Sequence, residues 1–154
     1  GARCGIGIYG LPHDGRNVGE GLRPVLTWVT EITHIHTVEK GEHASYSGRW
    51  TAQRRSRLGV VPMGYGDGYM RALSNKGEML CRGVRVPVVG SVCMDYILLD
   101  LTDLNEDVKA GEPVVVLGRQ GHQEISAADL AEKAGTIAYE IATNISARVA
   151  REAV

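Results

Sequence analysis

The chain has 154 residues, a formal net charge of −1 and no apolar run long enough to span a membrane. This length allows one domain with its own core, and the near-neutral charge argues against electrostatic binding to nucleic acid or to an anionic membrane. Three widely spaced cysteines, Cys4, Cys81 and Cys93, favour free thiols and a cytoplasmic setting over a disulfide framework.

The first 42 residues predict two strands and a linker. The N-terminal stretch CGIGIYGL is a short apolar run, which we interpret as a buried strand whose glycines allow close approach of the backbone. Residues 12–21 are polar and rich in turn formers, so they are the best candidate for a linker. From Val25 to Glu42, the alternation of residue types predicts one long strand with both faces partly covered.

Short aliphatic runs bounded by glycine, proline or aspartate predict five further strands, at residues 57–63, 78–83, 85–92, 96–101 and 113–118. The sequence RGVRVP indicates a hairpin around Gly83. Such closely spaced strands predict a mainly β domain, built as a Greek-key barrel or sandwich.

Two short helices are predicted near the C-terminus. The first has Ser126 as its N-cap, Asp129 in the capping-box position and Gly135 as its C-cap. The second opens with Thr136 as its N-cap and repeats isoleucine every four residues.

The glycine-rich stretch PMGYGDGYMRALSN, residues 62–75, resembles a phosphate-binding loop at first sight. However, the Lys-Ser/Thr pair of a P-loop is missing, and a dinucleotide fingerprint would need a βαβ unit where this sequence predicts strands on both sides. A tight turn explains the glycines but leaves Tyr65, Tyr69 and Arg71 unexplained. Two phenols and a guanidinium suit an anionic, polar ligand.

Three other candidates remain weak when taken alone. His34 and His36 share a strand face, but no third ligand has suitable spacing, so no metal site is predicted. Cys93 follows a β-run, yet the sequence indicates no histidine partner, which favours a buried thiol over a nucleophile. Tyr46 lies in the turn ASYSGRWTA and could act as an acid or base only with a lowered pKa or a cationic neighbour.

The order of five motifs is more informative than any one of them. RCGIGIYG, ASYSGRWTA, GYGDGYMRALSN, VPVVGSVCMDY and ISAADLAEKAGTIAYEI follow one another in a way that strongly resembles the C-terminal part of bacterial alanine racemases. The resemblance covers nearly the whole chain and is weakest at residues 12–21. It implies a homodimer in which each subunit has an N-terminal (β/α)₈ barrel that carries pyridoxal 5′-phosphate and a C-terminal β domain.

The same resemblance implies that the active site lies between the barrel of one subunit and the β domain of the other. Residues 1–11 would be the last strand of the barrel, and residues 12–154 the β domain. The cofactor lysine would belong to the absent part of the barrel, so this chain alone is expected to be inactive.

On the substrate side, the resemblance implies roles for five residues. Tyr46 would be the catalytic tyrosine, which exchanges the α-proton on one face of alanine bound to the partner's cofactor. The backbone amide of Met94 would bind the substrate carboxylate. Tyr65, Arg71 and Asp95 would form the gate of the substrate entrance, which tyrosines would narrow to admit a side chain as small as alanine's.

On the cofactor side, the resemblance implies that Arg3 bonds the pyridine nitrogen and that the backbone amides of Gly5 and Ile6 hold the phosphate. Tyr139 would lie on the phosphate side of the gate. Two departures stand out: Ser91 occupies a position where many relatives have arginine, and the tail reads RVAR where the family pattern is RVPR.

The implied function is racemisation of alanine for peptidoglycan synthesis. Three alternatives stay open at this point. They are a serine or broad-specificity racemase of the same fold, a non-catalytic β-barrel that only docks a partner, and a nucleotide-binding domain.

Overall fold

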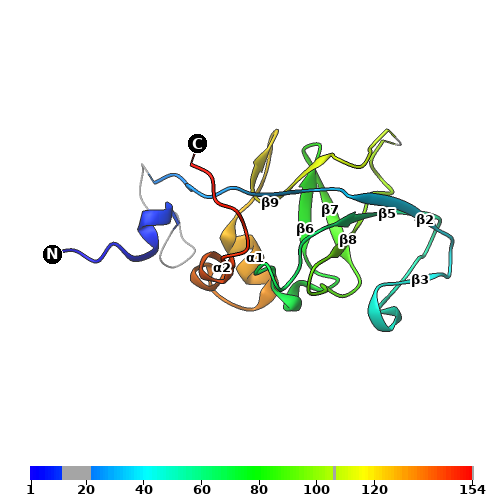
Figure 1. Cartoon of the computed structure of the whole chain (residues 1–154), viewed down its shortest axis with the longest axis horizontal. Coiled ribbons are helices and arrows are strands. Elements are labelled where there is room, and N and C mark those ends of the chain that lie inside the picture. The colour runs from blue at the N-terminus through cyan, green and yellow to red at the C-terminus, as the bar shows by residue number, and fades with distance from the viewer. Residues whose placement is uncertain (12–21, 106, 154) are drawn as a thin grey trace.

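An antiparallel β-sheet forms the body of the molecule, and two short helices follow it in the chain (Figure 1). The computed structural model describes residues 1–11, 22–105 and 107–153, so the predicted linker at residues 12–21 lies outside the described residues. The strands of the main sheet are β1 (Trp28–Glu31), β2 (His34–Val38), β5 (Ser56–Val61), β6 (Glu78–Cys81), β7 (Val84–Val89), β8 (Ile97–Asp100), β9 (Pro113–Gln120) and β10 (Gln123–Ile125).

The order of the strands is that of a Greek key. Along the sheet they follow β1-β9-β6-β7-β8-β5-β2, with β10 paired to β9. The consecutive strands β6, β7 and β8 lie side by side, and β9 returns by a long connection to pair with β6. The predicted mainly β, Greek-key fold with two C-terminal helices is therefore confirmed.

A bend at Ile32 and Thr33 brings the two ends of the sheet together. Ile32 donates its N–H to the carbonyl of Glu112, beside β9, whereas Thr33 donates its N–H to the carbonyl of Val60 on β5. No ladder joins β1 to β2 in the part of the chain that the structure describes, and the bend is the direct chain connection between these two end strands. The sheet is therefore barrel-like without a closed hydrogen-bond ring.

The single long strand predicted from Val25 is wrong, because this bend divides it. β1 pairs with β9, and β2 pairs with β5 at the opposite end of the sheet. Backbone groups on the two sides of the bend thus find different partners, which a straight strand could not reach. The fully buried Ile32 fills the corner.

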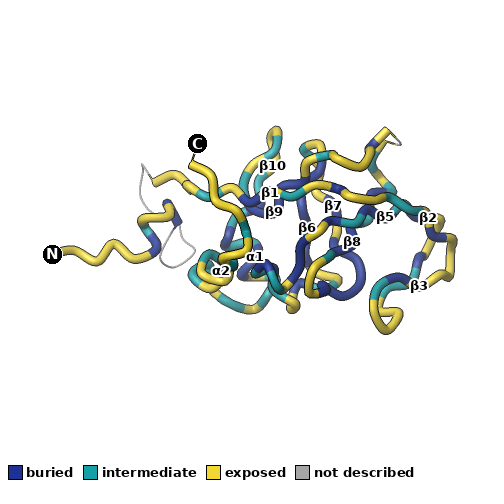
Figure 2. Tube along the Cα trace, in the orientation of Figure 1, coloured by how far each residue is buried: buried dark blue, intermediate teal, exposed yellow. Residues whose placement is uncertain are grey.

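The predicted N-terminal strand is also absent: residues Gly5–Tyr9 form a 3₁₀ helix, η1. No strand in the described ranges pairs with this segment, so a local turn satisfies its backbone, with Gly7 N–H donating to Cys4 and Gly10 N–H to Gly7. Figure 2 shows the segment as mostly exposed, in contrast to the buried strands of the sheet. Ile6 and Leu11 are its buried side chains.

Local sequence signals correctly predicted the hairpin and the first helix. The β6–β7 turn has Arg82 at φ 52° and Gly83 at φ 75°, as a two-residue type I′ turn requires. Helix α1 (Ala127–Ala134) begins with a complete capping box between Ser126 and Asp129, and Gly135 ends it at φ 76°.

The N-cap predicted for the second helix is one residue off. Helix α2 (Ala138–Asn144) has Ile137 at its N-cap, with no side-chain cap. Thr136 instead donates its N–H to the carbonyl of Ala131 and its hydroxyl to the carboxylate of Glu140. The close link to α1 therefore determines where α2 begins.

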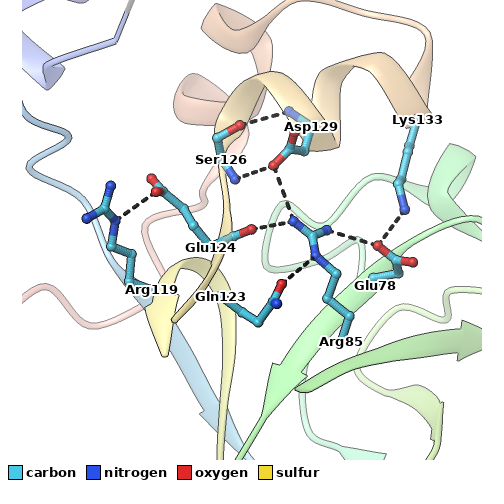
Figure 3. A network of polar contacts seen from close by, with 8 residues as sticks. All are labelled: Glu78, Arg85, Arg119, Gln123, Glu124, Ser126, Asp129 and Lys133. Carbon is cyan, nitrogen blue, oxygen red and sulfur yellow. Dashed lines mark hydrogen bonds and ion pairs between the residues drawn. The ribbon is translucent and has the colours of Figure 1, made fainter. Parts of the chain in front are cut away.

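A polar network attaches α1 to the sheet (Figure 3). Glu78 on β6 accepts from Arg85 on β7 at 3.0 Å and from Lys133 on α1 at 2.7 Å. Arg85 also donates to the carbonyl of Glu124 on β10. Burial opposes ionisation of Glu78, but the bonds from Lys133 and Arg85 outweigh it and hold its pKa below the ordinary value of 4.5.

We expect this network to stabilise the fold in a pH-dependent way. Because the folded pKa of Glu78 is lowered, its contribution is complete above the ordinary pKa and is lost as the pH falls through the folded pKa. Wild type should therefore melt at a higher temperature than Glu78→Gln at pH 7, and the gap should be smaller at a second, acidic pH below 4.5. Glu132→Gln, on the exposed side of helix α1, is the charge-matched control. An equal gap at both pH values would contradict the prediction.

Candidate functional site

Tyr46 lies in a strained loop between two short strands. It begins the 3₁₀ turn η2 (Tyr46–Gly48), which connects β3 (His43–Ala44) to β4 (Trp50–Thr51). Ser45 and Ser47 both have positive φ, at 67° and 59°. Such conformations cost about 1–3 kcal/mol for residues other than glycine and persist only where surrounding contacts enforce them.

The enforcing contacts come from the segment that follows β7. The Ser45 hydroxyl donates to the carbonyl of Ser91 and accepts from its N–H at 2.8 Å. A Cβ at residue 90 would lie 2.2 Å from the Cβ of Ser45, so only Gly90 allows this approach. This packing fixes the orientation in which the loop presents Tyr46.

The glycine-rich loop packs against the segment that follows Val92. Tyr65 N–H donates to the carbonyl of Cys93, and Gly66 N–H donates to that of Met94. A Cβ at residue 64 would lie 2.0 Å from the Cys93 carbonyl oxygen. The sequence explained the glycines by a tight turn. Gly64 is also needed because any side chain there would collide with the backbone of Cys93.

Asn75 and Ser74 tie the same three segments together. The Asn75 amide donates to the carbonyl of Arg49 at 3.0 Å, and its oxygen accepts from Gly90 N–H at 2.5 Å. The hydroxyl of Ser74 accepts from Val92 N–H. Three parts of the chain that are far apart in sequence thus form one rigid wall.

This wall surrounds a hollow of about 430 Å³. It brings together five of the residues singled out in the sequence: Tyr46, Tyr65, Arg71, Met94 and Asp95. The remaining lining residues are Ser47, Arg49, Ser91, Val92, Cys93 and Tyr96. Tyr46 is 64% exposed and Met94 51%, so both side chains are open to a molecule that enters the hollow.

Tyr65 and Arg71 border a second hollow as well. This hollow, of about 330 Å³, is also lined by Gly68, Met70, Ala72 and Asn144. Because they line both spaces, Tyr65 and Arg71 lie between them, which is geometrically consistent with a gate.

Tyr96 is a polar neighbour of Tyr46 that the sequence did not reveal. The two ring centroids are 6.1 Å apart with planes tilted by 40°. The pKa of the Tyr96 phenol is raised by its hydrogen bond with the Cys93 thiol, then by burial and by the bond with Tyr46. The raised pKa keeps the Tyr96 phenol protonated beside Tyr46.

The residues predicted to hold the cofactor lie elsewhere. Arg3 and Gly5 are exposed, and Ile6 is buried, in the N-terminal segment. Tyr139 lies on α2 and packs against the core, and it lines neither hollow. In Figure 1 the N-terminal segment and η2, which carries Tyr46, lie at opposite ends of the long axis, with α2 towards the N-terminal segment.

Tyr69 was expected near a polar ligand, and this expectation is wrong. Its ring is 1% exposed and lies edge-on to Trp28, with the centroids 6.4 Å apart. Its hydroxyl has no hydrogen-bond partner among the described residues. Residues 65 and 69 lie at opposite ends of a short turn. The side chain of Tyr65 lines the hollow, whereas that of Tyr69 is buried in the core.

The structure gives Cys93, His34 and His36 no partners for catalysis or metal binding among the described residues. Cys93 is buried, its sulfur donates to the Ser91 carbonyl, and no histidine lines the hollow. The rings of His34 and His36 stack at 5.9 Å, and burial, followed by the charge of His34, lowers the pKa of His36. Across the described residues, no group of three or more His, Cys, Asp or Glu side chains could hold a metal.

Two further findings concern the cysteines and the helices. Cys4, Cys81 and Cys93 are all free. Within the described ranges, no helix is both long and apolar enough to cross a membrane.

Comparison with known proteins gives consistent matches. The family model "Alanine racemase, C-terminal domain" matches residues 25–153. The alanine racemase of Halothermothrix orenii is 47% identical over 151 residues, which cover 97% of this chain and 40% of that protein. The chain thus spans about two fifths of the length of the curated relatives it matches.

Solved structures resemble the chain in three dimensions. The alanine racemase of Bacillus anthracis, solved with bound L-Ala-P, has a TM-score of 0.87 and 39% identity over 94% of this chain and 37% of its own. The alanine racemase of Bartonella henselae, solved with covalently bound pyridoxal phosphate, has a TM-score of 0.84 and 30% identity over 93% of this chain and 38% of its own.

Proposed function

Since the chain belongs to the alanine racemase C-terminal domain family, we propose that it is the C-terminal part of an enzyme that interconverts L- and D-alanine for peptidoglycan synthesis. The three free cysteines favour a cytoplasmic setting for this enzyme. The observation that carries the proposal is the convergence of Tyr46, Tyr65, Arg71, Met94 and Asp95 on one hollow.

The chemistry of racemisation suits this hollow. A racemase must remove the α-proton from one face of its substrate and return a proton on the other, so it needs a base on each face. The phenol oxygen of Tyr46 takes or gives the proton on one face. The Met94 N–H binds the substrate carboxylate, and the cations Arg49 and Arg71 favour an anionic group in the hollow.

The N-terminal segment fits pyridoxal 5′-phosphate. Arg3 is exposed, and nothing lies within 4 Å of where a Cβ at Gly5 or Gly7 would be, so the backbone is open to a phosphate. Arg3 would bond the ring nitrogen, and the amides of Gly5 and Ile6 the phosphate, with Tyr139 nearby. When bound, this cofactor supplies an electron sink for charge at the substrate's α-carbon.

The same geometry supports a homodimer with shared sites. The N-terminal segment and the turn after β3 lie at opposite ends of the molecule's long axis (Figure 1), which supports a site assembled from two copies rather than one. In a two-fold dimer, the hollow of one subunit can cover the cofactor of the other. Residues 1–11 would then be the end of the barrel and residues 12–154 the β domain.

Mixing two inactive variants of the full-length protein tests this arrangement. Tyr46→Phe impairs the hollow, and Arg3→Glu impairs the cofactor site. If each site uses one residue from each subunit, refolded mixtures should recover about a quarter of wild-type alanine racemisation, since half the dimers are mixed and each has one intact site.

Three results would count against parts of this proposal. No recovery in mixtures would place both residues in one subunit's site. A wild-type protein that prefers serine or accepts many amino acids would change the substrate. A wild-type protein that racemises nothing and binds no pyridoxal phosphate would leave only a docking module.

A further inference from the structure

The segment after α2 reaches Asp95, a lining residue of the hollow, through one arginine. Arg148 Nε donates to Asp67 Oδ1 at 2.8 Å, and its Nη2 donates to Asp95 Oδ1 at 2.5 Å. Asp67 belongs to the glycine-rich loop and Asp95 to the segment after Val92. One guanidinium therefore joins the loop that carries Tyr65 to the neighbouring segment that carries Asp95, and both of these residues line the hollow.

Asp67 transmits this contact to the loop that carries Tyr65. Its side chain is only 13% exposed, and its second carboxylate oxygen accepts from Gly64 N–H at 2.8 Å. Its own carbonyl accepts from Ser146 N–H, close to Arg148 in the chain. Asp67 thus closes the loop segment 64–67 through Gly64 and joins it to the C-terminal tail, residues 145–153, through Ser146 and Arg148.

Gly66 fits directly against the bridging group. A Cβ at residue 66 would lie 3.0 Å from Arg148 Nη1 and 3.0 Å from the Met94 carbonyl oxygen. The guanidinium of Arg148 and the carbonyl of Met94 therefore both lie close to Gly66. The backbone of Gly66 is not in the left-handed region, so its conformation suits alanine as well. The cost of Gly66→Ala would therefore come only from the contacts of the new methyl group with its neighbours.

A second arginine holds the tail in the shape that presents Arg148. Arg151 donates to the carbonyl of Ile145 at 2.8 Å, and also to those of Ser146 and Val149. These bonds close the turn around residue 148 without touching the hollow.

We propose that Arg148 is a positioning residue that sets the width of the substrate entrance by holding the Tyr65 loop and Asp95 at a fixed separation. The inference rests on the proposed function, because it assigns the hollow to an amino-acid substrate. A fixed separation limits the size of side chain that passes, and discrimination against one extra methylene is worth about 10–200-fold in such pockets.

The test uses Arg148→Met in the full-length enzyme, with alanine and 2-aminobutyrate as substrates. The variant should raise KM for alanine about tenfold with little change in kcat, and the preference for alanine over 2-aminobutyrate should fall about tenfold. Arg148→Lys, which keeps one charge contact, should recover part of the preference. Arg119→Met, at an exposed ion pair with Glu124, is the control for a lost positive charge.

Gly66→Ala provides a second route to the same effect with all charges kept. It should displace the guanidinium and lower the preference in the same direction. Unchanged preference in both Arg148→Met and Gly66→Ala, with folding intact, would overturn the proposal.

Amide hydrogen exchange separates this inference from the proposed function. In Arg148→Met the amides of Gly64, Tyr65 and Gly66 should exchange about tenfold faster, whereas those of α1 should not change. This measurement needs no racemase activity. If wild type racemised no amino acid but the loop lost protection in the variant, the proposed function would fail and the bridge would stand; unchanged protection would refute the bridge.

Discussion

Replacing Tyr46 with phenylalanine in the full-length protein is expected to lower kcat for alanine racemisation by about 10²- to 10⁴-fold, the usual cost of losing a positioned acid or base. KM should change by less than about tenfold, because phenylalanine keeps the ring and its contact with Tyr96. The phenol oxygen alone is removed from the hollow.

Exchange of the α-proton in deuterated water gives the sharper measurement. If Tyr46 works on one face only, the variant should lose exchange with one enantiomer and keep measurable exchange with the other, because the base on the opposite face remains. NMR of L- and D-alanine incubated separately with the variant measures this difference. Equal loss of exchange for both enantiomers, or a near-normal kcat, would remove Tyr46 from the role of base.

Replacing Tyr69 with phenylalanine is expected to stabilise the fold, although the residue is 1% exposed. Its hydroxyl has no partner among the described residues, and burial raises the pKa of the phenol, so it stays protonated and unsatisfied. Removing such a group should raise the free energy of unfolding by about 1 kcal/mol, and the melting temperature by about 2–4 °C. A lower melting temperature would mean that the hydroxyl is satisfied.

Gly77 supplies a matched test of the same contact. A Cβ at residue 77 would lie 2.1 Å from the Tyr69 hydroxyl oxygen, and the next atoms, Tyr69 Cζ and Val88 Cγ2, are at 3.2 Å. Gly77→Ala should therefore destabilise the protein by about 1–3 kcal/mol through overpacking. In the Tyr69→Phe background most of this cost should disappear, because the clashing oxygen is gone. Equal costs in both backgrounds, measured by urea unfolding, would contradict this geometry.

Features that depend on neighbours in sequence were predictable. The capping box of Ser126 and Asp129 and the turn at Gly83 form as their residue types require, because each satisfies its backbone within a few residues. The aliphatic runs likewise predicted strands β5 to β9 of the sheet. The order of the motifs indicated the family, and with it the residues that meet at the hollow.

Other features depend on partners that are distant in the chain. The break at Ile32 arises because β1 and β2 must pair at opposite ends of one sheet, and no local signal marks it. Arg148 gave no sign of its role, since its partner Asp67 lies 81 residues away.

The glycine-rich loop combines features set by its local sequence with features set by distant parts of the chain. Its sequence by itself determined that the chain could turn there and carry Tyr65 and Arg71. Only the tertiary structure decided that Gly64 packs against Cys93, that Tyr69 is buried beside Trp28, and that Tyr65 lines the hollow. The physical reason is that conformational freedom is a property of the residue, whereas contact and burial depend on which distant segments fold against it.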